Sequence, residues 1–335
     1  MADTGGDVSI GPGPLLDRET YRRLSQRRDA LAAMLLAIRV AFHVTLLAGA
    51  NLLLLTGHAL LAVLLLIPHF VAWSFLGWAG IGHELFHRSV FSSRRLNLVL
   101  FRLFSILTWS NYGFFEVTHP AHHRSTLGDG DLEASPHARL TPLGTLALLS
   151  VDVGTLWRRL QILIGNAVGA EPKGALARLF PPGSAEFIRL RDGARAVLAG
   201  QALLIGVCLA FGSSFLALAL SLAPFCVTFP TKTLSALQHF GLAADETPGD
   251  YAASTRTVVL DPVTAFFYAD MNYHLEHHHF PAIPHYHLRQ AHTVFRAEGR
   301  HRHLEVGYWA GLRLLARGGF FTGGQRVRRP PPPSG

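Results

Sequence analysis

The sequence predicts an all-α membrane protein with four transmembrane helices in two hairpins and a cytoplasmic helical cap rich in histidine. Three observations favour this fold class. Hydrophobic residues make up 49% of the 335 residues and charged residues only 16%, whereas a soluble domain is about one quarter charged. Four apolar stretches approach the ~20 residues that a helix needs to cross a bilayer. Arginines flank these stretches unevenly, which gives the spans an orientation.

The four apolar stretches define a membrane domain over residues 31–317. A polar arm, residues 1–30, precedes it; no signal peptide is expected there because the arm has no apolar segment. A proline-rich tail, residues 318–335, is expected to be disordered. The predicted spans are at about 31–55, 60–82, 194–211 and 215–230.

The arginines predict that both termini and the region between the hairpins lie in the cytoplasm. Five arginines precede the first span, whereas the short turns at 56–59 and 212–214 contain neither Lys nor Arg. Cytoplasmic loops are enriched in Lys and Arg, so the two turns are expected on the outer side of the membrane.

Two further apolar segments are predicted to lie at the membrane surface. Residues 96–117 are apolar enough to cross, but Arg102, Asn111 and Glu116 interrupt the run, so an interfacial or re-entrant helix is expected. Residues 142–168 have the pattern of an amphipathic surface helix. This leaves an even number of crossings before each histidine-rich segment.

Histidine occurs 19 times, and eight of these residues form three clusters. The clusters are His83 and His87, then His119, His122 and His123, then His274, His277 and His278. The second and third share the pattern H-x-x-H-H, of which composition alone predicts only about 0.06 matches. Residues i, i+3 and i+4 are neighbours on a helix, so each cluster presents its imidazoles on one face. All eight are therefore expected to converge on one cytoplasmic site.

Eight imidazoles exceed what one metal ion binds, so the clusters predict two ions. Neutral imidazole suits zinc, copper, iron and nickel, and two irons with open positions would activate dioxygen. The first cluster is also a literal H-E-x-x-H, the zinc-protease signature in which Glu84 would be the general base. That alternative leaves the two H-x-x-H-H clusters unexplained.

These motifs, taken in order, resemble the integral-membrane fatty-acid desaturase and hydroxylase superfamily over roughly residues 30–300. The run MNYHLEHHHFP at 271–281 is similar to the third histidine box of the desaturases. The run HHRST at 122–126, followed by GDLE at 130–133, is similar to the family as well. The resemblance implies a dioxygen-dependent di-iron desaturase acting on a fatty acyl chain or a similar lipid-like substrate.

Two alternatives remain open beside the desaturase. One is a hydroxylase or ketolase of the same superfamily, acting on an alkyl chain, a carotenoid or a small amino-acid-derived metabolite. The other, more remote, is an intramembrane zinc protease that uses His83, Glu84 and His87.

The resemblance also implies a further ligand, His239, before the third cluster. The expected metal ligands are then His83, His87, His119, His122, His123, His239, His274, His277 and His278. Acyl-CoA desaturases carry an Asn one helical turn before this position, where the present sequence has Ser235. That departure leaves a tenth, water-bridged ligand unsupported.

Other residues near the clusters have expected supporting roles. Acids are expected to accept the second N–H of the ligating imidazoles, and Glu84 at most does the same. These acids are Glu116, Asp131, Glu133, Asp270 and Glu276. The remaining neighbouring histidines, His279, His285, His287 and His292, are not expected to bind metal, and His43 and His69 are expected to pack helices. Candidate substrate-channel residues are Phe70, Trp73, Phe75 and Trp78.

The sequence also predicts which partners the enzyme needs. It has no flavin or nicotinamide fingerprint and only two cysteines, so electrons must come from a separate ferredoxin- or cytochrome-type donor with its reductase. An arginine-rich cytoplasmic face suits an acidic donor and anionic membrane lipid. Nucleic-acid binding is not expected, because the basic residues are dispersed around membrane spans. Abundant Arg, Ala and Gly favour a GC-rich bacterial genome and hence a plasma-membrane location.

Overall fold

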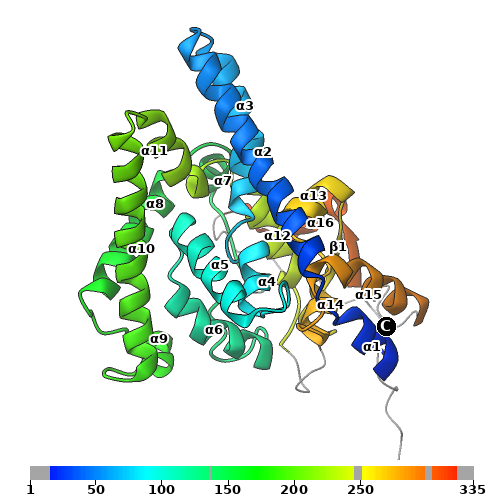
Figure 1. The fold of residues 1–335 in the computed structure, drawn as a ribbon. Helices are drawn as coiled ribbons and strands as arrows, with labels where there is room; N and C mark the ends of the chain where they lie inside the picture. The colour runs from blue at the N-terminus through cyan, green and yellow to red at the C-terminus, as the bar shows by residue number, and fades with distance from the viewer. Residues whose placement is uncertain (1–15, 136, 245–250, 299–303, 323–335) are drawn as a thin grey trace, which may run out of the picture.

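The computed structural model describes residues 16–135, 137–244, 251–298 and 304–322, and it is mainly helical, as predicted. Figure 1 shows a long hairpin of α2 (Asp29–Leu55) and α3 (Ala59–Ser74) that projects from a group of shorter helices. Beside this group stands α10 (Ala185–Ala210), followed by the short α11 (Ser214–Ser221).

Two helices of the described chain, α2 and α10, are each long and apolar enough to cross a membrane. They have 27 and 26 residues, which corresponds to about 40 Å each at 1.5 Å per residue. The outer part of the hairpin exposes large apolar side chains, such as Leu55 at 77% and Leu60 at 72%. This exposure is what a lipid-facing surface requires.

The second predicted span is shorter in the structure than the expected 60–82, because α3 ends at Ser74 after 16 residues. A tight turn follows, in which Ile81 N donates to Phe75 O at 3.1 Å. A Cβ atom on Gly80 would lie 2.2 Å from that carbonyl oxygen, so only glycine fits. Because of this turn, α4 (Ile81–Phe86) is a separate helix of the cap. This helix carries the first histidine cluster of the sequence.

The fourth predicted span, 215–230, is not one helix. It consists of α11, the 3₁₀ turn η1 (Ala223–Phe225) and the start of α12 (Phe229–His239). Pro224 and Pro230 lack the N–H that a continuous helix needs, and Val227 adopts a positive φ of 49°. The second hairpin is thus one long helix and one short helix.

The segments expected at the membrane surface are each broken in two. The pair α5 (Arg94–Leu107) and α6 (Tyr112–Arg124) is bent by 111°, so residues 96–117 form no straight span. If the bent pair is one broken span, the number of candidate spans rises from two to three. The predicted surface helix 142–168 divides into α7 (Pro142–Leu149) and α8 (Val153–Ala167), and Asp152 caps α8 through Thr155 N at 2.8 Å.

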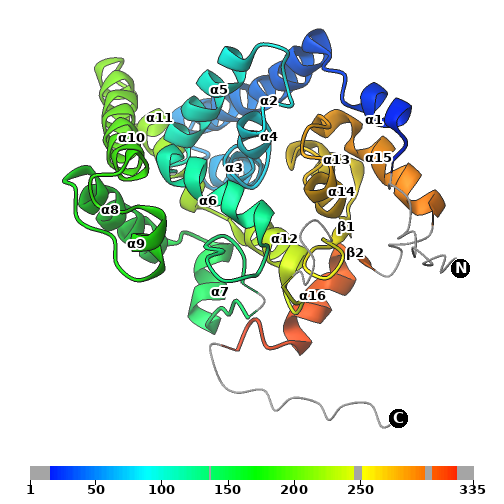
Figure 2. The ribbon, with the colours of Figure 1, turned by 90° about the horizontal axis from the view of Figure 1, so that it is seen from below.

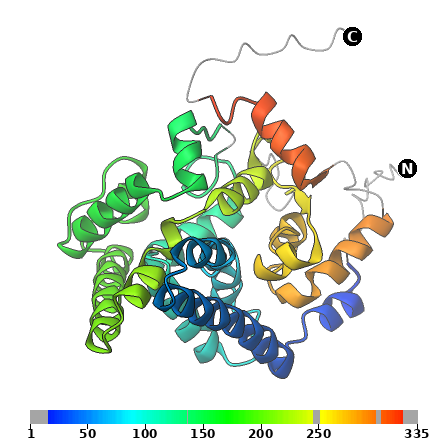
Figure 3. The same cartoon turned by 90° about the horizontal axis from the view of Figure 1, so that it is seen from above.

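The remaining elements complete the cap. They are α1 (Arg18–Leu24), α9 (Ala175–Leu179), α13 (Pro262–Phe267), α14 (His274–His279), α15 (His285–Glu298) and α16 (Tyr308–Arg317), with strands β1 (Thr257–Val259) and β2 (Glu305–Gly307). The two strands pair in parallel, with Thr257 opposite Glu305. Seen from below and from above, α1 and α9 lie near opposite edges of the molecule, with α14 between them (Figures 2 and 3).

Both predicted terminal segments are partly folded onto the cap. Residues 1–15 of the arm and 323–335 of the tail lie outside the described residues. In the arm, Leu24 O accepts a hydrogen bond from His287 Nδ1 at 2.7 Å, which fastens α1 to α15. In the tail, Phe320 is buried and its ring contacts Phe240, so the expected disorder does not begin at residue 318.

Two apolar cores hold the helices that carry the histidine clusters. Ile81, Leu85 and Phe101 belong to the core that joins α4 to α5 and α6. Leu237 and Met271 belong to a second core between α12 and the segment before α14. Figure 2 shows α4, α6, α12 and α14 grouped between these elements. Hydrophobic packing therefore fixes the four helices that present the histidines.

Candidate metal centre

All nine histidines singled out in the sequence lie together in the structure, in two clusters. The five-histidine cluster consists of His83, His87, His119, His123 and His277. The four-histidine cluster consists of His122, His239, His274 and His278. Within each cluster the offered nitrogen atoms lie within 4.8 Å of one another, so each cluster could hold a metal ion.

The two H-x-x-H-H boxes divide between the clusters in opposite senses. In α6, residues i and i+4 (His119 and His123) enter the five-histidine cluster, while i+3 (His122) enters the other. In α14, i and i+4 (His274 and His278) belong to the four-histidine cluster, while i+3 (His277) belongs to the five-histidine cluster. On an α-helix i+4 lies about 40° to one side of i and i+3 about 60° to the other. Each box therefore bridges both clusters.

The helices are fixed to their neighbours close to the histidines. Asn111 caps α6 by accepting from Gly113 N at 3.1 Å, and its Nδ2 donates to Leu190 O on α10 at 2.8 Å. Gln238, next to His239, donates to Met271 O at 2.8 Å. These bonds join α6 to α10 and α12 to the segment that leads into α14.

The Nδ1 atoms of four cluster histidines face fixed oxygen atoms. His119 Nδ1 donates to Glu133 at 2.7 Å, and His122 Nδ1 donates to Asp131 at 2.9 Å. His239 Nδ1 donates to the carbonyl oxygen of Ser254 at 2.9 Å. His277 Nδ1 lies 3.1 Å from Glu84 Oε1. Metal-bound histidines typically use their second nitrogen in this way, which sets the tautomer and the ring orientation.

The Nε2 atoms point inward, toward one another. His87 Nε2 and His119 Nε2 are 2.9 Å apart in one cluster, and His239 Nε2 and His274 Nε2 are 3.1 Å apart in the other. His83 Nε2 is buried and makes no hydrogen bond with any residue that the structure describes. Buried nitrogen atoms without a hydrogen-bonding partner are costly unless something else binds them.

Seven imidazoles of the centre are held in their neutral form. Burial, together with the charges that neighbouring histidines would carry, lowers the pKa of most of them well below the ordinary value; these are His83, His87, His119, His123, His274 and His278. Burial lowers the pKa of His239 to about 3. Burial also raises the pKa of the Glu133 carboxyl to about 7, against the opposing effects of His122 and Thr118. Neutral imidazole is the form that binds transition metals, so the residues present fit a pair of such ions.

A cavity of about 310 Å³ opens beside both clusters. Its wall includes His83 and His119 from one cluster and His122 and His274 from the other. Trp78 supplies part of the apolar wall. A substrate in this cavity would contact both clusters at once, while the buried sides of the clusters exclude water.

The sequence model of the fatty acid desaturase family matches residues 58–309, three quarters of the chain and both clusters. The chain belongs to the fatty acid desaturase family. Membership implies oxidoreductase activity, and together with the long apolar helices it indicates a membrane protein. No curated protein is found to match the chain.

Only some of the acids expected beside the desaturase centre contact the nine histidines. Asp131 and Glu133 do, as described above. Glu116 instead lies 3.6 Å from Arg102, and Asp270 lies 3.8 Å from His285. Glu276 lies inside the third box but accepts from His292 Nδ1 at 2.6 Å and from Thr257 at 2.6 Å. It faces away from the clusters, because i+2 lies on the opposite side of α14 from the histidines.

Glu84 has a larger structural role than its sequence position indicates. Its side chain is fully buried between His277 and Ser89, whose Oγ donates to Glu84 Oε2 at 3.1 Å. The expectation that Glu84 at most orients a histidine agrees with this position. The partner, His277, lies far away in the sequence, so only tertiary structure identifies it.

His43 and His69, which were expected to pack helices, contact each other between α2 and α3. Their Nδ1 atoms are 3.1 Å apart inside the α2–α3 hairpin, and the ring of Trp73 lies against both. Both histidines face the inside of one hairpin. Aligning the two spans as a hairpin would have predicted their contact, whereas considering each span separately does not. Of the predicted channel residues, Trp78 lines the 310 Å³ cavity, whereas Phe75 is buried in the core.

Proposed function

We propose that this protein is a dioxygen-dependent di-iron desaturase that introduces a C=C bond into a fatty acyl chain or a similar lipid-like substrate. The observation that carries the proposal is the convergence of nine imidazoles, seven buried and two partly buried, in two clusters within a chain of the desaturase family. One iron would be held by the five-histidine cluster and the other by the four-histidine cluster. Two irons bound there would supply the oxidising chemistry that removes hydrogen from an unactivated C–H bond.

The residues of the chain position and protect the reaction. Asp131, Glu133 and the Ser254 carbonyl hold ligand imidazoles in the tautomer that leaves Nε2 free. A substrate carbon in the 310 Å³ cavity would lie against both clusters, and Trp78 forms part of the apolar side of this cavity. Burial of the imidazoles excludes water from the oxidant.

Each turnover requires electrons from outside the chain. Removal of two hydrogen atoms from the substrate, with one dioxygen, two electrons and two protons, yields the alkene and two waters. A separate ferredoxin- or cytochrome-type donor with its reductase would deliver the electrons. An arginine-rich cytoplasmic surface, including Arg22, Arg23, Arg27 and Arg28 around α1, supports docking of an acidic donor.

The zinc-protease alternative requires Glu84 to act as a general base on a water molecule. Glu84 is fully buried and lies behind His277, on the Nδ1 side of the ring, and it does not line the cavity beside the clusters. Glu84→Gln is therefore expected to weaken an iron- and dioxygen-dependent reaction about 10-fold or more without abolishing it. Complete loss of activity with unchanged metal content would favour the general-base role instead.

We also propose that the centre and both termini face the cytoplasm of a bacterial plasma membrane. Ser125 is exposed beside the second box, and both native cysteines are buried, so Ser125→Cys offers a specific labelling site. An impermeant thiol reagent should modify this cysteine only after the membrane is opened. Modification of intact cells from outside would contradict the proposed orientation.

Mass spectrometry of lipids from cells that express the chain tests the reaction itself. A loss of two hydrogens from an acyl chain, dependent on iron and dioxygen, is expected. A gain of one oxygen would identify a hydroxylase or ketolase of the same superfamily, and peptide cleavage would identify a protease. His137→Ala is the matched control because His137 is exposed and belongs to neither cluster.

A further inference from the structure

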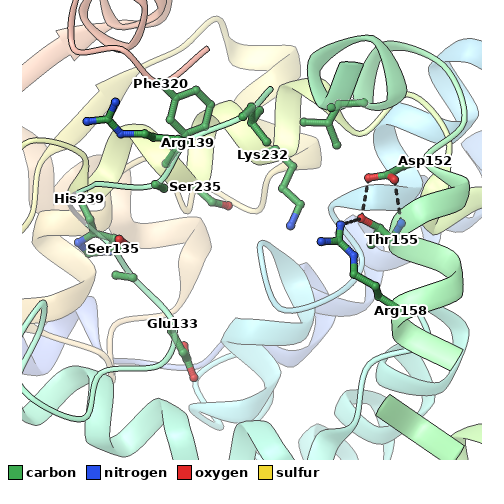
Figure 4. Close-up of a pocket in the computed structure, with 16 residues that line it drawn as sticks. Glu133, Ser135, Arg139, Asp152, Thr155, Arg158, Lys232, Ser235, His239 and Phe320 are labelled. Atoms are coloured by element: carbon green, nitrogen blue, oxygen red, sulfur yellow. Dashed lines mark hydrogen bonds between the residues drawn. The ribbon is translucent and has the colours of Figure 1, made fainter. Parts of the chain in front are cut away.

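Three adjoining cavities meet at one lysine next to the metal centre. Cavities of about 360, 310 and 200 Å³ all have Lys232 and Ser235 in their walls. The 310 Å³ cavity is the one that touches both histidine clusters. The three cavities thus form one cleft that runs from the centre past Lys232, and Figure 4 shows the Lys232 side chain extending into its middle.

Lys232 shares one face of α12 with a histidine of the centre. Lys232, Ser235 and His239 are at positions i, i+3 and i+7, which fall on the same side of an α-helix, and all three line the 310 Å³ cavity. Seven residues correspond to a rise of about 10 Å along the axis. The helix therefore fixes the spacing between the backbone positions of Lys232 and His239 along the cleft.

The charges around Lys232 are mostly positive. Arg139, Arg158 and Arg159 line the connected cavities with it. Arg158 donates to Gly154 O at 3.3 Å, and Arg159 donates to Trp109 O at 3.2 Å, so backbone carbonyls hold these two guanidinium groups.

The two carboxylates in the cleft are already engaged. Asp152 accepts from the backbone N and the Oγ1 of Thr155 at 2.8 and 2.6 Å, and it thereby caps α8. Glu133 accepts from His119 at 2.7 Å and from Thr118 at 2.6 Å. Neither carboxylate forms an ion pair with Lys232 in the described structure.

Lys232 itself makes no hydrogen bond or ion pair with any residue in the described ranges, and the chain contains only one other lysine, Lys173. Lys232 is exposed to the cleft, and the protein around it lowers the pKa of its amine through desolvation and through the positive charges of Arg159 and Arg158, although Asp152 opposes them. A bound anion would offset this repulsion. A lysine is a compact point charge, unlike the arginines that the chain uses elsewhere.

We infer that the substrate carries an anionic group, a carboxylate or a phosphate, which the ammonium of Lys232 binds in this cleft. The inference rests on the proposed function, because it assumes that the carbon to be oxidised occupies the 310 Å³ cavity. Lys232 then selects substrates whose anionic group lies farther along the cleft than the reacting carbon. Arg158 and Arg159 line the same cleft and add positive potential that favours the anion.

Amine labelling of the full-length protein in detergent tests this inference, since the chain has two lysines. The probes are octanoate, octyl phosphate and octanol, and labelling of each lysine is followed by mass spectrometry. At ten times the Kd of either anion, labelling of Lys232 should slow about tenfold, because about one tenth of the sites stays free. Labelling of the exposed Lys173 should not change, and octanol should not protect Lys232.

The comparison of octanoate with octyl phosphate identifies the anion, because the better-matched group protects at the lower concentration. Equal protection by octanol would overturn the inference, since an apolar tail would then suffice. No protection of Lys232 by either anion would overturn it as well. The experiment needs no dioxygen or electron donor, so its outcome is independent of whether the desaturase reaction is correct.

Two variants provide a second measurement. Lys232→Met should abolish octanoate binding, measured by titration calorimetry, and Lys232→Arg should retain most of it. Metal content should stay the same in both variants, because Lys232 belongs to neither cluster. Undiminished octanoate binding by Lys232→Met, in a variant with full metal content, would contradict the inference.

Discussion

The five-histidine and four-histidine clusters use the same two sequence boxes but differ in what completes them. The five-histidine cluster is completed by His83 and His87 from the first box, one turn apart on the chain. The four-histidine cluster is completed by His239 alone, which belongs to no box. The first cluster thus has one imidazole more, from a local motif. The second depends on a residue that only the packing of α12 brings into place.

This difference predicts unequal tolerance to change. Loss of one imidazole from the five-histidine cluster leaves as many nitrogens as the other cluster has when complete. Loss of one from the four-histidine cluster leaves three. Both clusters border the 310 Å³ cavity, but only the four-histidine cluster, through His239, also lines the adjoining 360 Å³ cavity. We therefore expect the four-histidine cluster to be the more sensitive half of the centre.

The largest expected effect comes from removing one imidazole of the four-histidine cluster, and the comparison is removal of one imidazole of the five-histidine cluster. His278→Ala should lose one metal ion and reduce activity by more than the ~10–100-fold that loss of a supporting group costs. His87→Ala should retain more metal per chain than His278→Ala, because four imidazoles remain in its cluster. Metal content by mass spectrometry and product formation check both variants against His137→Ala. An equal or greater loss in His87→Ala would remove the proposed asymmetry.

The carboxylates behind the clusters should give the next largest effect. Asp131, whose side chain is 1% exposed, orients His122 of the four-histidine cluster, whereas Glu133, at 18%, orients His119. Asp131→Asn should weaken metal binding about 10–100-fold, and Glu133→Gln by less. Chelator competition measures both, with the exposed Asp129→Asn as the matched control. Similar losses in Asp129→Asn and Asp131→Asn would show that the contact with His122 is unimportant.

The smallest effect is expected at the histidine pair of the membrane hairpin. Among the residues that the structure describes, His43 and His69 contact each other and no carboxylate, so they lack the oriented geometry of the clusters. His69→Leu should leave metal content unchanged and destabilise the fold by about 1–3 kcal/mol, because it leaves the buried Nδ1 of His43 without its hydrogen-bonding partner. The double variant His43→Leu, His69→Leu should recover most of that stability. Thermal unfolding measures both, and loss of metal in His69→Leu would link the pair to the centre.

Much of the centre is predictable because helical spacing is a local property. The positions i, i+3 and i+4 identify the boxes, and resemblance to the family adds His239. Which carboxylates serve the centre is not local. Asp131 and Glu276 both lie near boxes, yet only Asp131 contacts a cluster histidine, because α14 turns Glu276 toward His292. The pairing of Glu84 with His277 and of His43 with His69 likewise depends on tertiary contacts.

The fold is predictable as helical and apolar, but hydropathy alone misplaces where helices end. The expected span 60–82 stops at Ser74 because Gly80 allows a tight backbone approach. The expected span 215–230 breaks at Pro224 and Pro230. The glycine and the two prolines are visible in the sequence, but hydropathy averaged over an apolar window does not show that they end a helix. These breaks matter for function, since they release the α4 and α12 helices that present His83 and His239.

Metal quantification of the purified full-length protein tests the central claim most directly. The account predicts two irons per chain, one for each cluster. His278→Ala, which leaves only three imidazoles in the four-histidine cluster, should lose iron and activity together. One zinc per chain, with activity that does not depend on iron, would contradict the di-iron centre proposed here.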